Sequence, residues 1–417
     1  MKKLLVAAIA AAFAPSAALA TTGYFAHGYG MKAKGMGGVG IALPQDSLAA
    51  ATNPAGMALV GNRFDVGVDW FRPDRGAEIT GSPVPGLNGT YDGNGTQDFL
   101  LPEFGYNRMI RPDLALGVSV YGNGGMNTDY KTSPFGAIGG QNPAGVDLAQ
   151  LFISPTIAYK MGAHAFGVSL NLAYQRFKAE GLQPFDNPFF SSHPGNVTNQ
   201  GYDSSTGWGL RFGWTGQVLP TLTLGVTYQT KTQMGKFDKY KGLFAEQGGF
   251  DIPENYGVGV AWKPTDKWTI AADIQRINYG DVASVGHPID CLFAGACQLG
   301  SDNGAGFGWQ NTTVYKLGVA YEMSQSLTLR GGFVTLKQPI PQSQTFFNIV
   351  APGVVENHVT AGATWTLANK SEITAAYMHA FENKVNGQGS IPAALGGGEA
   401  NLRMSEDSLG VAWGMKF

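Results

Sequence analysis

Hydrophobic and polar residues alternate with a period of two along most of the chain after Asn62. From Phe64 to Trp70, hydrophobic residues occupy every second position, and aspartates or glycine lie between them. This period is typical of β-strands with one apolar face. Together with weaker segments at 99–108 and 150–160, it predicts an all-β chain of about 14 strands. The same alternation recurs at 114–121, 166–174, 208–215, 222–229, 256–263, 268–278, 313–321, 327–336, 359–367, 373–381 and 409–417.

The predicted connections alternate between short turns and long loops. Short turns on one side and long loops on the other are typical of outer-membrane β-barrels. The pattern therefore predicts a transmembrane antiparallel β-barrel over residues 62–417, with the N-terminal segment on the periplasmic side. The turns are expected at 109–113, 161–164, 219–221, 264–267, 323–326 and 368–371, and the loops at 73–98, 123–149, 177–206, 234–255, 279–311, 337–356 and 382–406.

Residues 1–20 have the features of a secretory signal peptide. Lys2 and Lys3 precede an apolar run from Leu4 to Ala14, and small residues lead to a cleavage site after Ala20. This order of charged, hydrophobic and cleavage regions is that of an export signal. We expect the mature chain to begin at Thr21.

Residues 21–61 lack the strand pattern and are predicted to form a hatch, a plug in the barrel lumen. The glycine-rich stretch from Gly35 to Gly56 allows close backbone approach. Asp46 is expected to cap a short helix over 47–51, which Asn53-Pro54 would end. A flexible N-terminal tail is the alternative.

Composition supports a membrane barrel. Charged residues make up only 14% of the chain, against about a quarter in soluble domains, and no apolar run after residue 20 approaches the ~20 residues of a membrane helix. The net charge of -2 gives no sign of nucleic-acid binding. Phe417 ends the last alternating strand, which resembles the signal for the barrel-assembly machinery. Aromatic belts are predicted at Trp70, Trp208, Trp214, Trp262, Trp268 and Trp413.

The sequence contains no recognisable catalytic or metal-binding set, so we expect neither an enzyme nor a cofactor. The six histidines are scattered without metal-ligand spacing. Asp273 beside Gln275 could belong to a hydrolase site, but no paired histidine lies on a neighbouring predicted strand. Cys291 and Cys297 are predicted to form a disulfide in an exported chain, with free thiols as the alternative.

Three motifs resemble the FadL-type family of outer-membrane transporters. Asn53-Pro54-Ala55 is similar to the hatch motif of this family, residues 124–130 to its segment after the third strand, and residues 171–180 to its fifth strand. The resemblance implies a 14-strand barrel plugged by a hatch. It also implies passive uptake of long-chain fatty acids or aromatic hydrocarbons in the outer membrane of a Gram-negative bacterium.

In this family, cargo is captured in an outer-loop groove, passes the hatch and leaves sideways through the barrel wall. We expect the lateral opening at Gly124 and Gly125, with an ordinary turn as the alternative. The expected partners are hydrophobic small molecules, outer-membrane lipid and lipopolysaccharide, and the protein is expected to be a monomer. The groove candidates, for which self-packing of the loops is the alternative, are Phe185, Phe189, Phe190, Phe237, Tyr240, Leu243 and Phe244.

Basic residues could hold a cargo carboxylate. Arg176 and Lys178 could equally contact lipopolysaccharide. Arg211, Lys316 and Arg330 face the predicted lumen, where inter-strand salt bridges are the alternative. Two other functions stay open at this point, a general aqueous porin and a surface-binding protein or adhesin that uses the long loops.

Overall fold

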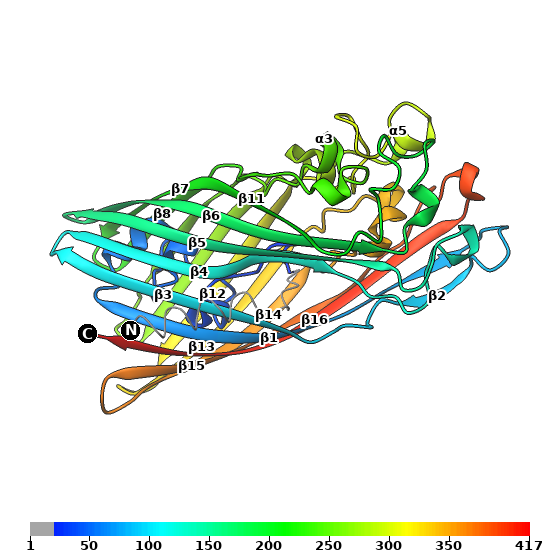
Figure 1. The fold of residues 1–417 in the computed structure, drawn as a ribbon. Coiled ribbons are helices and arrows are strands. Elements are labelled where there is room, and N and C mark those ends of the chain that lie inside the picture. Colours follow the sequence, from blue (N-terminus) through cyan, green and yellow to red (C-terminus); the bar gives the residue numbers. More distant parts are fainter. Residues whose placement is uncertain (1–20) are drawn as a thin grey trace.

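The computed structural model describes residues 21–417, so the predicted signal peptide at 1–20 lies outside the described residues. Within this range, fourteen long strands form a closed antiparallel barrel (Figure 1), as predicted. Strands that follow each other in sequence are paired, and β1 (Arg63–Thr80) pairs with β16 (Glu399–Lys416) to close the ring. The other barrel strands are β3 (Phe99–Arg111), β4 (Leu114–Asn127), β5 (Gly145–Met161), β6 (His164–Glu180), β7 (Asp203–Leu219), β8 (Leu222–Gln229), β10 (Asn255–Trp262), β11 (Trp268–Ile277), β12 (Thr312–Glu322), β13 (Leu327–Leu336), β14 (Asn357–Thr366) and β15 (Ser371–Val385).

The barrel is apolar outside and polar in much of its interior. On β1, Val66, Val68 and Trp70 are exposed on the outer face, whereas Asp65 and Asp69 are buried in the lumen. This arrangement is the reverse of a soluble barrel and is typical of a wall that faces lipid. In residues 21–417, helices long and apolar enough to cross a membrane are absent.

The strands extend further at the loop end than the sequence pattern predicts. β1 continues to Thr80, which pairs with Glu399 of β16, and β6 continues to Glu180. The predicted loops at 73–98, 177–206 and 382–406 are therefore too long. Beyond Trp70 the outward residues of β1 are polar, whereas inward residues such as Phe71 and Ile79 are apolar and buried, so the sense of the alternation is reversed. The backbone ladder continues because its hydrogen bonds do not depend on side-chain polarity.

The outer loops fold over one end of the barrel, where Figure 1 shows α3 and α5. Two short strands extend the sheet there, β2 (Gly89–Asp92) beside β1 and β9 (Gln233–Met234) beside β7. The helical turns of these loops are η3 (Gly136–Ile138), η4 (Gln183–Phe185), η5 (Asp238–Tyr240), α3 (Ala245–Gly248), η6 (Tyr279–Asp281), α4 (Ala283–Gly286), α5 (Asp290–Phe293), η7 (Gln342–Gln344), η8 (Phe347–Val350) and η9 (Ala393–Leu395).

The segment that precedes β1 lies inside the barrel (Figure 1), which contradicts the alternative of a free tail. It contains α2 (Met31–Lys34), η1 (Ala49–Ala51) and η2 (Pro54–Ala58). The helix predicted over 47–51 is only the three-residue η1, although Asp46 does accept a hydrogen bond from the Leu48 amide at 3.0 Å. Asn53 instead caps η2, because Pro54 keeps it out of helical geometry.

Candidate functional site

An ion pair fastens the hatch to the barrel wall. Lys34 Nζ in α2 lies 2.7 Å from Asp69 Oδ2 on β1, and both side chains are buried. The Ser408 hydroxyl on β16 donates to the second oxygen of Asp69 at 3.0 Å. Removal of one partner would leave the other buried without its direct ion-pair partner, which is costly.

A second charged network lies around Arg63 at the start of β1. Lys32 Nζ in the hatch lies 2.6 Å from Glu372 on β15, and Arg63 contacts the same carboxylate at 2.9 Å. Arg63 also pairs with Asp65 at 2.5 Å, and Asp65 accepts a hydrogen bond from the Ser47 amide at 2.9 Å. Two hatch positions are thus tied to two wall strands by one network.

Asp46 adds a carboxyl group on the hatch side of this network. Burial raises the pKa of Asp46 to about 6, and repulsion from the nearby Asp65 carboxylate adds to this shift. The positive charges of Arg63 and Lys32 lower it in part. The hatch therefore sets acidic and basic groups close together at the inner wall.

Polar side chains also bind the hatch backbone. Asp273 of β11 accepts hydrogen bonds from the amides of Gly40 and Ile41 at 2.8 and 3.1 Å. Asn53 of the Asn-Pro-Ala motif donates to the carbonyls of Ile41 at 2.6 Å and Trp214 at 3.0 Å. Asp273 thus has a structural contact in place of the hydrolase role considered from the sequence.

The three basic candidates of the lumen lie near the hatch. Arg211 donates to the Thr52 carbonyl at 3.0 Å, and Arg330 donates to Gln45 Oε1 at 3.1 Å. Lys316 is buried on β12 and pairs in register with Asp273 of β11. Among the described residues, neither arginine forms a salt bridge, and both contact the hatch directly.

Arg176 and Lys178 lie in the outer part of β6 and already have partners. Arg176 lies 3.8 Å from Asp147, and Lys178 lies 2.9 Å from Glu180. Both cations lie over the Tyr202 ring, at 4.7 and 5.5 Å from its centre. A cargo carboxylate would have to compete with these contacts.

The aromatic groove candidates occur in two packed groups. In one, Phe237, Tyr240 and Phe244 surround Phe177, with ring centroids 5.7, 4.8 and 4.6 Å away. These four side chains are buried. The loops therefore pack on themselves at this point.

The second group includes Phe185 and Phe190, whose ring centroids are 5.8 Å apart. Phe189 contacts Phe190 but is 66% exposed, so it alone of the candidate phenylalanines faces the solvent openly. Leu243 packs against the same apolar core and is partly buried. Six of the seven groove candidates are thus buried or partly buried, and the groove itself stays a prediction.

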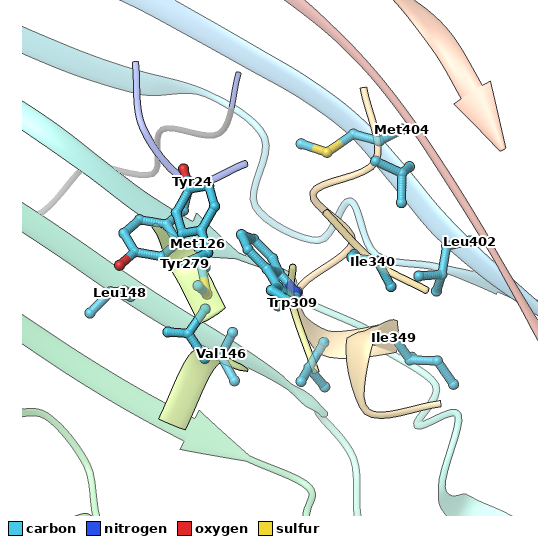
Figure 2. Packing of buried hydrophobic residues seen from close by; sticks show 14 of the residues in the cluster. Tyr24, Met126, Val146, Leu148, Tyr279, Trp309, Ile340, Ile349, Leu402 and Met404 are labelled. Carbon is cyan, nitrogen blue, oxygen red and sulfur yellow. The ribbon is translucent and has the colours of Figure 1, made fainter. Parts of the chain in front are cut away.

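The largest apolar cluster fills the lumen between the hatch and the outer loops, and we call this region the outer chamber. Figure 2 shows part of it, including Tyr24 of the hatch beside Tyr279 and Trp309 of the loop between β11 and β12. The Tyr24 ring centroid lies 5.1 Å from that of Tyr279 and 5.8 Å from that of Trp309. A cavity of about 20 Å³ lies between Tyr24, Trp309, Met126 and Met404. This volume is close to that of one water molecule.

The barrel wall has an interruption beside this chamber, between residues 99–103 of β3 and 121–127 of β4. The ladder between these strands ends at the pair Phe104 and Val120, although both strands continue. β4 remains paired with β5, with a register shift between Gly122 and Gly124. We call this interruption the wall gap.

Hatch residues occupy the wall gap. The Gly125 amide donates to the Tyr24 carbonyl at 3.0 Å, and the Ala26 amide donates to the Asn123 carbonyl at 3.2 Å. A side chain at Gly124 would collide with the Tyr24 carbonyl. Gly124 and Gly125 thus lie within β4, whereas the sequence placed them in the loop after it.

Comparison with known proteins identifies the family. The family model described as "Outer membrane protein transport protein (OMPP1/FadL/TodX)" matches residues 7–417. The chain belongs to the OMPP1/FadL/TodX family. It is therefore an outer membrane transport protein of β-barrel architecture and not an enzyme, as predicted.

Solved structures share the fold of this OMPP1/FadL/TodX-family barrel. The Pseudomonas putida toluene transporter TodX is 20% identical, with 95% of this chain and 100% of TodX covered and a TM-score of 0.69. A Pseudomonas aeruginosa FadL homologue is 16% identical, with coverages of 95% and 100% and a TM-score of 0.74. The Ralstonia pickettii toluene transporter TbuX is 18% identical, with coverages of 94% and 99% and a TM-score of 0.65. No curated protein matches the sequence.

The outer loops of this family member contain the cysteine pair. Cys291 and Cys297 form a disulfide in the loop between β11 and β12. Within residues 21–417, no group of three or more histidine, cysteine or acidic residues could hold a metal ion.

Trp309 and Tyr279 of the outer chamber lie in a predicted loop without a motif that points to them, whereas Met126 belongs to the segment 124–130 that resembles the family. A signal for the wall side of the chamber was present at Leu402 and Met404, which are apolar at the inward positions of β16. They depart from the polar interior expected of a porin.

Proposed function

We propose that the protein is a passive channel for hydrophobic compounds, either long-chain fatty acids or aromatic hydrocarbons. The observation that carries this proposal is the outer chamber, an apolar and aromatic compartment that fills the lumen above a charged hatch. A water-filled porin has a polar interior instead. TodX and TbuX, which share the fold, are named as toluene transporters, and this supports an aromatic cargo.

The chamber supplies the free energy of capture without an energy source. A hydrophobic molecule gains about 0.8 kcal/mol for each methylene group that it removes from water. Aromatic side chains such as Tyr24 and Trp309 offer both contact area and ring stacking. Release into the membrane exchanges one apolar environment for another, so no gradient is required.

We propose that cargo enters between the outer loops, passes through the outer chamber and leaves sideways through the wall gap. Three features support this order. The aromatic groups of the loops continue to the chamber through Phe250, whose ring lies 4.9 Å from Phe244 and 6.1 Å from Tyr24. The chamber borders the wall gap at Met126. Buried ion pairs hold the hatch against the barrel wall, which favours a lateral exit over a passage through the hatch.

Uptake by cells tests the proposal. A bacterial strain without its own transporters of this family should accumulate radiolabelled toluene or oleate faster when it produces the protein. The Asp98→Asn variant changes an exposed outer side chain and serves as a matched control that should behave like the unchanged protein. Equal accumulation with and without the protein, for both compounds, would contradict transport and favour a surface-binding role.

A further inference from the structure

Along the outward face of β6, apolar residues give way to basic residues toward the outer-loop end. Leu170 and Leu172 are exposed, Tyr174 follows, and Arg176 and Lys178 come next. Because alternate residues of a strand point to the same side, they form one column on the outer wall. Tyrosine is typical of the boundary between the apolar core of a membrane and its headgroups. Arg176 and Lys178 therefore lie at the level of the lipid headgroups of the outer leaflet.

The apolar part of this column borders a groove of about 780 Å³ in the outer wall. Leu172 is in register with Ile153 of β5 and Trp208 of β7, and all three line the groove together with Met234 of β9. Leu172 and Trp208 are exposed on the outer face, so the groove opens to the membrane and not to the lumen. Its volume lies within the range of about 300–1,000 Å³ that is usual for ligand sites. An acyl chain of a membrane lipid fits such a groove.

A polar hollow of about 450 Å³ lies further along the same column. Lys178 and Glu180 of β6 line it, as do Asp147 of β5 and Tyr202, which directly precedes β7. The Arg176 Cζ and Lys178 Nζ atoms both lie over the Tyr202 ring, at 4.7 and 5.5 Å from its centre. One aromatic ring thus holds two positive charges close together beside the hollow.

The acidic residues of the hollow leave both cations open to a further partner. Arg176 lies 3.8 Å from Asp147, and Lys178 lies 2.9 Å from Glu180, but the two cationic side chains remain 18% and 28% exposed. Ion pairs with this much exposure contribute little to stability and exchange readily with other partners. Asp147 accepts a hydrogen bond from the Tyr202 hydroxyl at 2.5 Å on Oδ2, whereas its Oδ1 is buried without a hydrogen-bond partner in residues 21–417.

We propose that this column binds one molecule of a phosphorylated glycolipid of the outer leaflet, the lipid A part of lipopolysaccharide. One acyl chain occupies the groove, and a phosphate group contacts Arg176 and Lys178. Sugar hydroxyl groups donate to the carboxylates of Asp147 and Glu180, which explains why acids and bases share the hollow. A phospholipid also has acyl chains and a phosphate but lacks the sugar. The site lies on the lipid side of the wall, so this inference does not depend on the proposed function.

Native mass spectrometry of the purified protein in detergent tests this inference. The probes are diphosphoryl lipid A, its dephosphorylated form and phosphatidylglycerol. We expect one lipid A per protein, bound roughly ten-fold or more tightly than either other lipid, because two charge-assisted contacts are formed. Arg176→Gln combined with Lys178→Gln should remove this preference. Thr206→Trp, which fills the groove beside Tyr174, should weaken lipid A and its dephosphorylated form alike.

Arg276→Gln combined with Lys384→Gln is the matched control, because it removes the same number of positive charges from β11 and β15. It should keep the full preference for lipid A, and heat-dependent electrophoretic mobility should show that every variant is folded. Equal affinity for lipid A and phosphatidylglycerol in the unchanged protein would overturn the inference. So would a preference that survives dephosphorylation or the loss of Arg176 and Lys178, or unchanged binding in Thr206→Trp. Each of these results leaves the proposed function intact, because uptake is measured separately.

Discussion

At the scale of single residues, the contacts of the hatch motif explain its composition. The Asn53 amide group bridges the hatch backbone at Ile41 and the barrel wall at Trp214. The sequence showed the motif, and family resemblance gave it a place in the hatch. Its wall partner could not be predicted, because Trp214 lies 161 positions away and only the closed barrel brings the two together.

A substitution at Gly124 tests the proposed lateral route most directly. Gly124→Val should reduce uptake to near the level of cells without the protein, because the added side chain collides with the Tyr24 carbonyl in the wall gap. Gly125→Val, whose backbone amide binds the same carbonyl, should have a similar effect. The measurement is the initial rate of toluene or oleate uptake, with folding checked by electrophoretic mobility. Gly331→Val is the control, since an added Cβ there has 3.7 Å of space. Normal uptake in a folded Gly124→Val variant would rule out this exit.

At the scale of elements, the alternation of residues predicted the positions of the barrel strands and of the short turns. Their outer ends were missed because the outward residues become polar there, as at Arg72 beyond Trp70, while inward residues such as Phe71 and Ile79 are apolar. The secondary structure inside the hatch was not predicted correctly for a different reason. Its short helical turns are held by wall side chains such as Asp273, so local sequence alone does not specify them.

The ion pair between Lys34 and Asp69 should determine how firmly the hatch is held. Asp69→Asn removes the carboxylate that pairs directly with the buried Lys34 ammonium, and we expect the hatch to be destabilised by about 3 kcal/mol. Hydrogen exchange in residues 30–40 should then accelerate while the barrel strands stay protected. Asp98→Asn, which disrupts the exposed pair with Arg72, should cost less than about 1 kcal/mol. The prediction fails if both variants show the same protection.

At the scale of the whole molecule, the lumen of the barrel has two chemically different parts. In one part, ion pairs join the hatch to charged residues of the inner wall. The other part is the apolar outer chamber. The sequence predicted the barrel and the plug because both leave local patterns. The chamber is assembled from distant segments, Tyr24, Trp309 and Met404 among them, and only the fold reveals it.

The proposed function requires that the hatch closes the lumen to water and ions while hydrophobic cargo passes by another route. Ion conductance in planar lipid bilayers tests it most directly, by comparing the full protein with a variant that lacks residues 35–55. We expect the full protein to pass few ions and the deletion to raise the conductance many-fold. A high conductance in the full protein that the deletion leaves unchanged would contradict it and identify a general porin.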